Sequence, residues 1–346
     1  MAGMDVADKG ITSRDAMSRW LRSSTGLHGD LHWHQVAGGL SNITYVVTGG
    51  AGRRVVVRRP PLGELTGGAH DVLREARIMA ALNSTAVPVP MILATCPDLD
   101  VAGAPFYVMD HAAGAVLDTA AAARQVPVGQ RRSLGLQLVG VLASLQAVDL
   151  DAVGLTSLWR RTPYLQRQIR RWNAQWKATS GRPVPAIDHV SFRLQKVLPA
   201  LTPQPDCLVH GDFRFGNVMV TAGPEPGISA LLDWELATTG HPLADLGFLG
   251  ARVQAPAGVL VPGPDPSAVE GFPAYGDLVD RFHQLTGVSV ADLPVFVALS
   301  AWRWAIIAEG IHQRFARGEM GEVHSDVGWH RRRVELLATF AADVLG

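Results

Sequence analysis

Residues 207–246 read CLVHGDFRFGNVMVTAGPEPGISALLDWELATTGHPLADL, and this stretch decides the fold. A first apolar run leads to Asp212, and Asn217 follows five positions later. A second apolar run, residues 228–232, is followed directly by Asp233. Each apolar run predicts a buried strand, and the polar residue after it marks the point where the strand leaves the core. We therefore expect Asp212, Asn217 and Asp233 to face a common cleft.

The residue types of this stretch suit phosphoryl transfer. A carboxylate can orient an attacking hydroxyl, while an amide oxygen and a second carboxylate can hold Mg²⁺ on nucleotide phosphates. Asp212 and Asn217 have the Asp-x4-Asn spacing of kinase catalytic loops, and Asp233 closes the next strand, where kinases place their metal-binding Asp. The alternative is a strand–turn–strand unit whose acidic residues only cap turns, and the three-part match disfavours it.

Three motifs carry a family resemblance: HGDxxxGN, LLDWE and PLADLG, which begin at positions 210, 231 and 242. They resemble the aminoglycoside phosphotransferase and choline kinase type of small-molecule kinase. The resemblance implies an α+β, two-lobed, protein kinase-like fold, with a β-rich N-terminal lobe and a mainly helical C-terminal lobe. It implies ATP and Mg²⁺ as cofactors, Asp212 as catalytic base, and Asn217 and Asp233 as magnesium ligands. It also makes Asp245 a supporting acidic residue. Because Asp245 opens a predicted helix, we expect it to act as an N-cap that also fixes the catalytic loop. We expect His210 to support this loop by hydrogen bonding, because the adjacent Asp212 already fills the role of base.

A glycine-bearing loop precedes two β-forming runs, residues 43–48 and 53–58, which predict a hairpin. Backbone N–H groups of such a loop can approach phosphates closely. A simple hairpin turn explains the glycines about as well, but a loop before a VVVR strand is where kinases carry their nucleotide-covering loop. The nucleotide-binding residues predicted here are Gly39, Leu40, Ser41 and Asn42.

Arg58 ends the strand that in kinases ends in Lys. Arg can bind phosphate oxygens bidentately, but it is bulkier than Lys and stays charged, so the two are not equivalent in geometry. A predicted helix over residues 69–82 contains Glu75, which the kinase resemblance pairs with Arg58 near the reacting phosphates. The alternative is a solvated Glu75 paired with Arg74 or Arg77.

The run RRPP at residues 58–61 resembles the subgroup of this family that is found fused to or beside acyl-CoA dehydrogenases. An inactive kinase is the alternative explanation of Arg58, although the polar residues after the two later strands are intact. Residues 106–112, FYVMDHA, resemble the hinge between kinase lobes. The resemblance implies that adenine bonds the carbonyl of Asp110 and the N–H of Ala112, and that Met109 borders the adenine pocket.

Residues 158–182 carry Arg and Lys but no Asp or Glu, and Trp159, Trp172 and Trp176 lie among them. A helical face with one sign of charge and several indoles can bind an anionic ligand, with Arg for phosphates and Trp for stacking. The alternative is a solvated helix face.

The acceptor is expected to be a hydroxylated small molecule. Only 12 residues lead from Asp233 to Asp245, which leaves no room for the long activation segment of protein kinases. The dehydrogenase-associated resemblance implies a hydroxyacyl-CoA or related hydroxy acid, and the basic segment suits an anionic acceptor. The alternatives are an aminoglycoside or antibiotic O-phosphotransferase, and a nucleotide-binding pseudokinase module.

Length and composition limit the lobe organisation and the class of protein. A chain of 346 residues predicts two lobes, which we place at residues 1–110, with the nucleotide-covering loop and hinge, and 111–346, with the catalytic loop and acceptor site. Lys plus Arg and Asp plus Glu both number 31, so no net charge attracts nucleic acid. No apolar signal core and no run of ~18 uninterrupted apolar residues occurs, which predicts a cytoplasmic protein without a membrane span.

Overall fold

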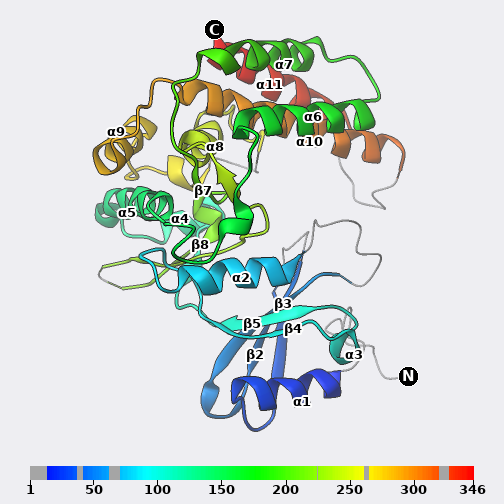
Figure 1. Cartoon of the computed structure of the whole chain (residues 1–346), viewed down its shortest axis with the longest axis vertical. Coiled ribbons are helices and arrows are strands. Elements are labelled where there is room, and N and C mark those ends of the chain that lie inside the picture. Colours follow the sequence, from blue (N-terminus) through cyan, green and yellow to red (C-terminus); the bar gives the residue numbers. More distant parts are fainter. Residues whose placement is uncertain (1–13, 37–41, 62–70, 224, 261–264, 319–326) are drawn as a thin grey trace.

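The computed structural model describes residues 14–36, 42–61, 71–223, 225–260, 265–318 and 327–346. An antiparallel sheet of five strands forms the N-terminal lobe, and helices make up most of the C-terminal lobe (Figure 1). The predicted α+β, two-lobed fold is therefore confirmed. In order along the sheet, the strands are β1 (His32–Gln35), β2 (Ile43–Thr48), β3 (Arg54–Arg59), β5 (Phe106–Asp110) and β4 (Ile92–Cys96). The helices of this lobe are α1 (Arg14–Thr25), α2 (Val72–Leu82) and α3 (Leu99–Ala102).

Side-chain alternation along β3, the middle strand, decides which residues reach the cleft. Val57 packs in the cluster formed with α1 and α3, whereas Val56 packs in the cluster formed with α2. Because successive side chains point to opposite faces, Arg58 lies on the α2 side and Arg59 on the other. Arg59 is fully buried and donates from Nη1 to the carbonyl of Ala102 at 2.9 Å. The second residue of the basic pair is therefore structural.

The C-terminal lobe is organised around one long helix, α10, which packs against α6, α7, α8 and α11 (Figure 1). Within the described part of the chain, α10 is the one helix long and apolar enough to cross a membrane, and 72% of its apolar window is buried inside the protein. We interpret α10 as the core helix of this lobe. The helices are α4 (Ala120–Arg124), α5 (Val128–Gln146), α6 (Tyr164–Thr179), α7 (Pro185–Val197), α8 (Leu243–Gln254), α9 (Tyr275–Thr286), α10 (Leu293–Ala316) and α11 (Val327–Leu345).

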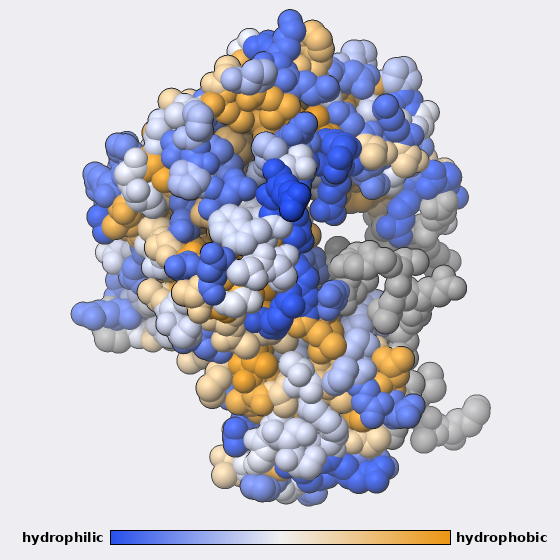
Figure 2. Space-filling model, in the orientation of Figure 1, coloured by the Kyte–Doolittle hydropathy of each residue, from blue (hydrophilic) through white to orange (hydrophobic). Residues whose placement is uncertain are grey.

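Short strands at the boundary of the lobes carry the decisive stretch. Two small antiparallel sheets form there, one of β7 and β10, the other of β6, β8 and β9. The loop with Asp212 follows β7, and Asp233 follows β9, as the apolar runs predicted. The space-filling view shows a hollow on the right-hand side between the two lobes (Figure 2). The strands are β6 (Ala115–Val116), β7 (Cys207–Val209), β8 (Val218–Val220), β9 (Ile228–Leu231) and β10 (Thr238–Gly240).

Candidate active site

A cavity of about 490 Å³ lies between the five-stranded sheet and the decisive stretch. Its walls include Arg58 of β3 and, from the C-terminal lobe, Asn217 and Asp233. The predicted hinge residues Met109, Asp110 and Ala112 also line it, so the structure brings them to the same cavity as the predicted metal ligands. The backbone N–H of Asp110 donates to the carbonyl of Met91 at 2.9 Å, and it is therefore not free to bind a ligand.

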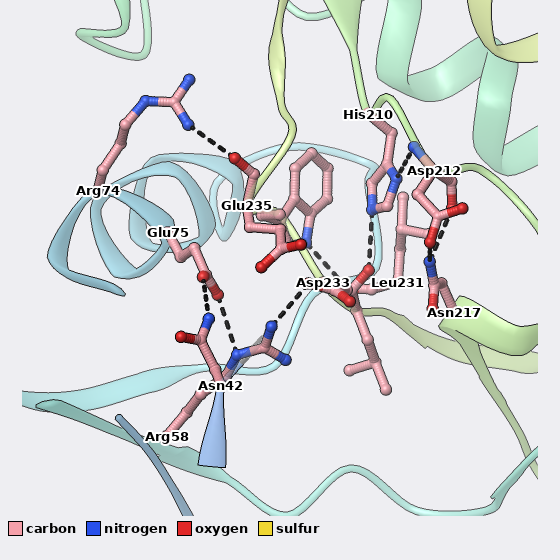
Figure 3. A network of polar contacts seen from close by, with 12 residues as sticks. Asn42, Arg58, Arg74, Glu75, His210, Asp212, Asn217, Leu231, Asp233 and Glu235 are labelled. Atoms are coloured by element: carbon pink, nitrogen blue, oxygen red, sulfur yellow. Dashed lines mark hydrogen bonds and ion pairs between the residues drawn. The ribbon is translucent and has the colours of Figure 1, made fainter. Parts of the chain in front are cut away.

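The carboxylate of Asp212 is held by two side chains of its own loop. Asn217 donates from Nδ2 to Oδ2 of Asp212 at 2.7 Å and to its backbone carbonyl at 2.8 Å (Figure 3). Nε of Arg214 lies 3.3 Å from the same Oδ2. Because the amide nitrogen of Asn217 is used in this way, its Oδ1 is the atom that remains to bind a cation.

The buried carboxylate of Asp245 holds the backbone of the catalytic loop. Oδ2 and Oδ1 of Asp245 accept hydrogen bonds from the backbone N–H groups of His210, at 2.7 Å, and Gly211, at 2.8 Å. Burial raises the pKa of Asp245, while His210 and the two N–H donors oppose the shift. Asp245 lies inside the first turn of α8, whose N-cap is Pro242. The predicted N-cap role is therefore wrong, and the predicted fixing of the loop is confirmed.

The fully buried side chain of His210 joins the two halves of the site. Its Nδ1 accepts from the backbone N–H of Asp212 at 3.3 Å, and its Nε2 lies 2.8 Å from the carbonyl of Leu232. A carbonyl can only accept, so Nε2 carries the proton. The ring also meets Trp234 edge-on, with centroids 4.8 Å apart. His210 is thus a support of the loop, as predicted, and both of its nitrogens are occupied.

Arg58 bridges two carboxylates across the cavity (Figure 3). Its Nε lies 3.2 Å from Oε2 of Glu75, and its Nη2 lies 2.7 Å from Oδ1 of Asp233. Burial acts to lower the pKa of Arg58, but the neighbouring acidic groups outweigh it and the pKa is raised. Asp233 itself has a φ of +65°, a left-handed conformation that Asp tolerates better than most residues. The predicted pairing of Glu75 with Arg58 is therefore present.

Glu75 is almost completely buried and has two further partners. Asn42 donates from Nδ2 to its Oε1 at 2.9 Å, and Tyr107 donates from its hydroxyl to Oε2 at 3.2 Å. Burial raises the pKa of Glu75 to about 7, against the opposing charge of Arg58. The side chain of Asn42 thus serves Glu75, and its predicted contact with nucleotide stays a prediction. Of the other predicted loop residues, Gly39, Leu40 and Ser41 lie outside the described part of the chain.

Two arginines of α2 reach across to the C-terminal lobe. Arg74 donates to the backbone carbonyl of Glu235 at 3.4 Å (Figure 3). It also donates to the backbone carbonyl of Ala237. Arg77 donates from Nη2 to Oγ of Ser157 at 2.9 Å. The alternative in which Glu75 pairs with one of these arginines is therefore wrong. They instead tie α2, and with it Glu75, to the segment that follows Asp233.

The basic segment 158–182 forms no continuous ligand-binding face. Trp172 and Trp176 are buried, and Arg167 donates to the carbonyls of Thr162 and Thr239. Arg182 makes ion pairs with Glu309, at 3.3 Å, and Glu335, at 3.0 Å. Two indoles of the segment are thus core residues, and part of its charge is used inside the protein. The exposed basic residues of α6 are Arg170, Arg171 and Lys177.

The residues around the cavity fit Mg²⁺. The described residues contain no group of three or more His, Cys, Asp or Glu side chains that could cage a metal ion. Mg²⁺ does not require one, because it usually binds one or two carboxylates together with water and phosphate oxygens. The amide oxygen of Asn217 and the carboxylate of Asp233 are donors of the right type on one cavity wall.

Comparisons with known proteins agree with this geometry. The chain is 34% identical over 298 residues to acyl-CoA dehydrogenase family member 11 of Gallus gallus. The match covers 84% of this chain but only 38% of that relative, so the chain spans well under half the relative's length.

Solved structures of phosphotransferases share the fold. A crystal structure from Ralstonia eutropha JMP134, assigned to the aminoglycoside phosphotransferases, is 31% identical, with a TM-score of 0.78. It covers 96% of this chain and 98% of that one. A thermostable mutant of an aminoglycoside phosphotransferase, in complex with ADP and hygromycin B, has a TM-score of 0.59 at 17% identity and covers 93% and 97% of the two chains, which shows the fold alone.

The family itself is identified by sequence. The model of the phosphotransferase enzyme family matches residues 23–282, which include the whole sheet of the N-terminal lobe, the loop of Asp212 and the helix of Asp245. The match therefore spans both walls of the cavity and every described residue discussed above as a candidate ligand or catalytic group. The chain belongs to the phosphotransferase enzyme family.

Proposed function

We propose that this chain transfers the terminal phosphoryl group of ATP to a hydroxyl group of a small molecule. The observation that carries the proposal is the Asp212 carboxylate, held by Asn217 beside a cavity whose opposite wall presents Arg58. Asp212 orients the acceptor hydroxyl and takes its proton as the new O–P bond forms and the bond to ADP breaks. Asn217 and Asp233 would hold Mg²⁺, which would supply positive charge to the nucleotide phosphates.

The remaining residues of the cavity position the nucleotide. Met109 and Ala112 hold the base at the junction of the lobes, and Arg58 contacts the phosphates. Glu75 keeps the guanidinium of Arg58 turned toward the cavity, because it is itself fixed by Asn42 and Tyr107. Positioning and charge compensation of this kind provide most of the acceleration in phosphoryl transfer.

The acceptor that we propose is a hydroxyacyl-CoA or a related hydroxy acid. The relative from Gallus gallus is named as an acyl-CoA dehydrogenase family member, and a chain that resembles part of it would act on chemically related compounds. An aminoglycoside acceptor is the second candidate, favoured by the hygromycin B complex of a structural neighbour. Aminoglycosides are polycations, whereas the exposed charges of α6 are Arg and Lys.

An acceptor panel tests the proposal. ADP release from Mg-ATP is measured with hydroxy acids, their CoA thioesters, choline and kanamycin. We expect turnover with the acids or thioesters and none with kanamycin. Turnover with kanamycin alone would replace the proposed acceptor class with the aminoglycosides.

A nucleotide-binding module without turnover is a further candidate, favoured by the 2.7 Å contact of Arg58 with Asp233. In that case the Arg58 side chain would keep the Asp233 carboxylate from binding Mg²⁺. Thermal stabilisation by ATP without ADP release from any acceptor, and without an effect of Asp212→Asn, would support this candidate.

Arg58→Lys should weaken ATP binding. A single guanidinium bridges Glu75 and Asp233 through two different nitrogens, and the ammonium of Lys is a point charge that cannot reproduce this fork. We expect the KM for ATP to rise about tenfold, because one charged hydrogen bond is lost. The change in kcat should be smaller. Steady-state kinetics check this, and an unchanged KM would show that Arg58 does not contact the nucleotide.

The activity should depend on the protonation of Glu75. Burial raises the pKa of Glu75 to about 7, so lowering the pH through this value neutralises the carboxylate and releases Arg58. We expect kcat/KM for ATP to fall as the pH drops below about 7. Glu75→Gln should have a low kcat/KM for ATP at every pH, without a further fall near the pKa of Glu75. If kcat/KM of Glu75→Gln still falls at the same pH, the titrating group is not Glu75.

A further inference from the structure

Arg303 of α10 is a buried cation that forms no ion pair with any described residue. Its side chain is only 9% exposed, and in the described part of the protein it makes no hydrogen bond or ion pair. Its Nε is shut off from solvent and has no acceptor. Burying a charged group without a hydrogen-bonded ion pair is costly, so the position of Arg303 calls for compensating interactions.

Two aromatic rings give part of that compensation. The guanidinium carbon lies 5.4 Å from the ring centroid of Trp172 on α6 and 5.9 Å from that of Phe248 on α8. Trp172 is itself fixed, because its Nε1 donates to Oε1 of Gln168 at 3.2 Å. Cation–π contacts stabilise the charge of a guanidinium but leave its N–H donors unused. The rings therefore contact a guanidinium that has no hydrogen-bond acceptor among the described residues and whose Nε is buried.

This guanidinium lies close to the catalytic loop. Asp245, Phe248 and Arg252 share one face of α8, since they are three and four residues apart. Asp245 holds the loop, and Phe248 contacts Arg303 one helical turn, about 5 Å, further along. The charge of Arg303 also lowers the pKa of Asp245, against the larger effect of burial. Arg303 thus lies near the carboxylate that anchors the catalytic loop.

We propose that Arg303 binds an acidic group, a carboxylate or a phosphate, of the acceptor molecule whose hydroxyl Asp212 activates. The inference rests on the proposed phosphotransferase function. A guanidinium fork matches the two oxygens of either group and gives short, charge-assisted hydrogen bonds. Arg303, and not the exposed basic residues of α6, then selects anionic acceptors over polycations.

The test compares Arg303→Met with the wild type on three probes. These are 3-hydroxybutyrate, its methyl ester and 3-hydroxybutyryl-CoA. The free acid offers a carboxylate, the thioester offers the phosphates of CoA, and the ester offers neither. Binding is measured by calorimetry in the presence of ADP, and KM is measured wherever turnover occurs. Arg170→Met, an exposed arginine of α6, is the matched control.

We expect Arg303→Met to weaken binding of the acid or the thioester about 10- to 100-fold, as the loss of charged hydrogen bonds predicts. Loss for the acid alone assigns a carboxylate, and loss for the thioester alone assigns a phosphate. The methyl ester should be unaffected by the substitution, and Arg170→Met should change none of the three. Arg303→Lys keeps the charge but not the fork, and it should show an intermediate loss.

A purely structural Arg303 gives a different result. Arg303→Met would then lower Tm while the anions bind as in the wild type, or it would weaken all three probes equally, and either outcome overturns the proposal. If Arg303→Met does not fold, an Arg303→Lys variant with wild-type binding of all probes also overturns it. Anion binding that depends on Arg303 but is not followed by ADP release contradicts the proposed function and leaves this inference standing.

Discussion

Asp212→Asn should lower kcat by about 10²- to 10⁴-fold, the range for loss of a general base. The amide has almost the shape of the carboxylate, so the loop should keep its conformation, but it cannot accept the hydroxyl proton. Nucleotide binding should persist, because Arg58, Met109 and Ala112 lie outside this loop, and the new amide oxygen can still accept from Asn217, the proposed magnesium ligand. Coupled ADP-release kinetics and calorimetry with ATP measure the two effects separately.

Asp280→Asn is the matched control for this substitution. Asp280 is an exposed carboxylate of α9, and its replacement removes the same charge from the same lobe. We expect kcat to remain at the wild-type value. An equal loss of kcat in both variants would mean that the net charge of the lobe, and not the proton acceptor at position 212, governs the rate.

Asp245→Ala should destabilise the protein and also abolish turnover. The substitution leaves the backbone N–H groups of His210 and Gly211 buried without their acceptor. Two unsatisfied buried donors should lower the free energy of unfolding by about 2–5 kcal/mol. Gly211 has a φ of +88°, and a Cβ there would lie 2.9 Å from the carbonyl of Leu236, so this loop has little freedom to find other partners.

Urea denaturation of Asp245→Ala and Asp212→Asn separates anchoring from chemistry. The Asp212 carboxylate is about a quarter exposed, so its replacement should cost much less stability than that of the buried Asp245. If Asp245→Ala unfolds at the wild-type urea concentration yet lacks activity, Asp245 acts in the reaction and not as an anchor.

The sequence predicted that polar residues of the site would lie directly after buried strands. Asp212 and Asp233 are placed by β7 and β9, and such strands are recognised from their apolar runs. The spacing placed Asn217 close after Asp212, but the hydrogen bond between their side chains was not predicted and is a finding of the structure. The pairing of Glu75 with Arg58 followed from the family resemblance, and the structure explains it by the alternation of β3, which turns Arg58 toward α2.

Contacts that depend on packing between distant elements could not be predicted. The buried Glu75 requires hydrogen-bond donors, and Asn42, just before β2, and Tyr107 of β5 provide them. The sequence indicated Tyr107 only weakly: alternation along its strand places it on the same face of the sheet as Met109, which was predicted to border the adenine pocket. No feature of the sequence indicated Arg303, because the two rings that it contacts, Trp172 and Phe248, come from helices far apart in the sequence.

Direct detection of the phosphorylated product tests the central claim. Mass spectrometry follows the acceptors of the panel after incubation with Mg-ATP and either the wild type or Asp212→Asn. The account predicts a phosphate ester on a hydroxyl of a hydroxy acid or its CoA thioester with the wild type, and almost none with the variant. Equal product with both proteins would contradict the assignment of Asp212 as the catalytic base. ATP binding with no phosphorylated acceptor in either sample would contradict the assignment of the chain as an active phosphotransferase.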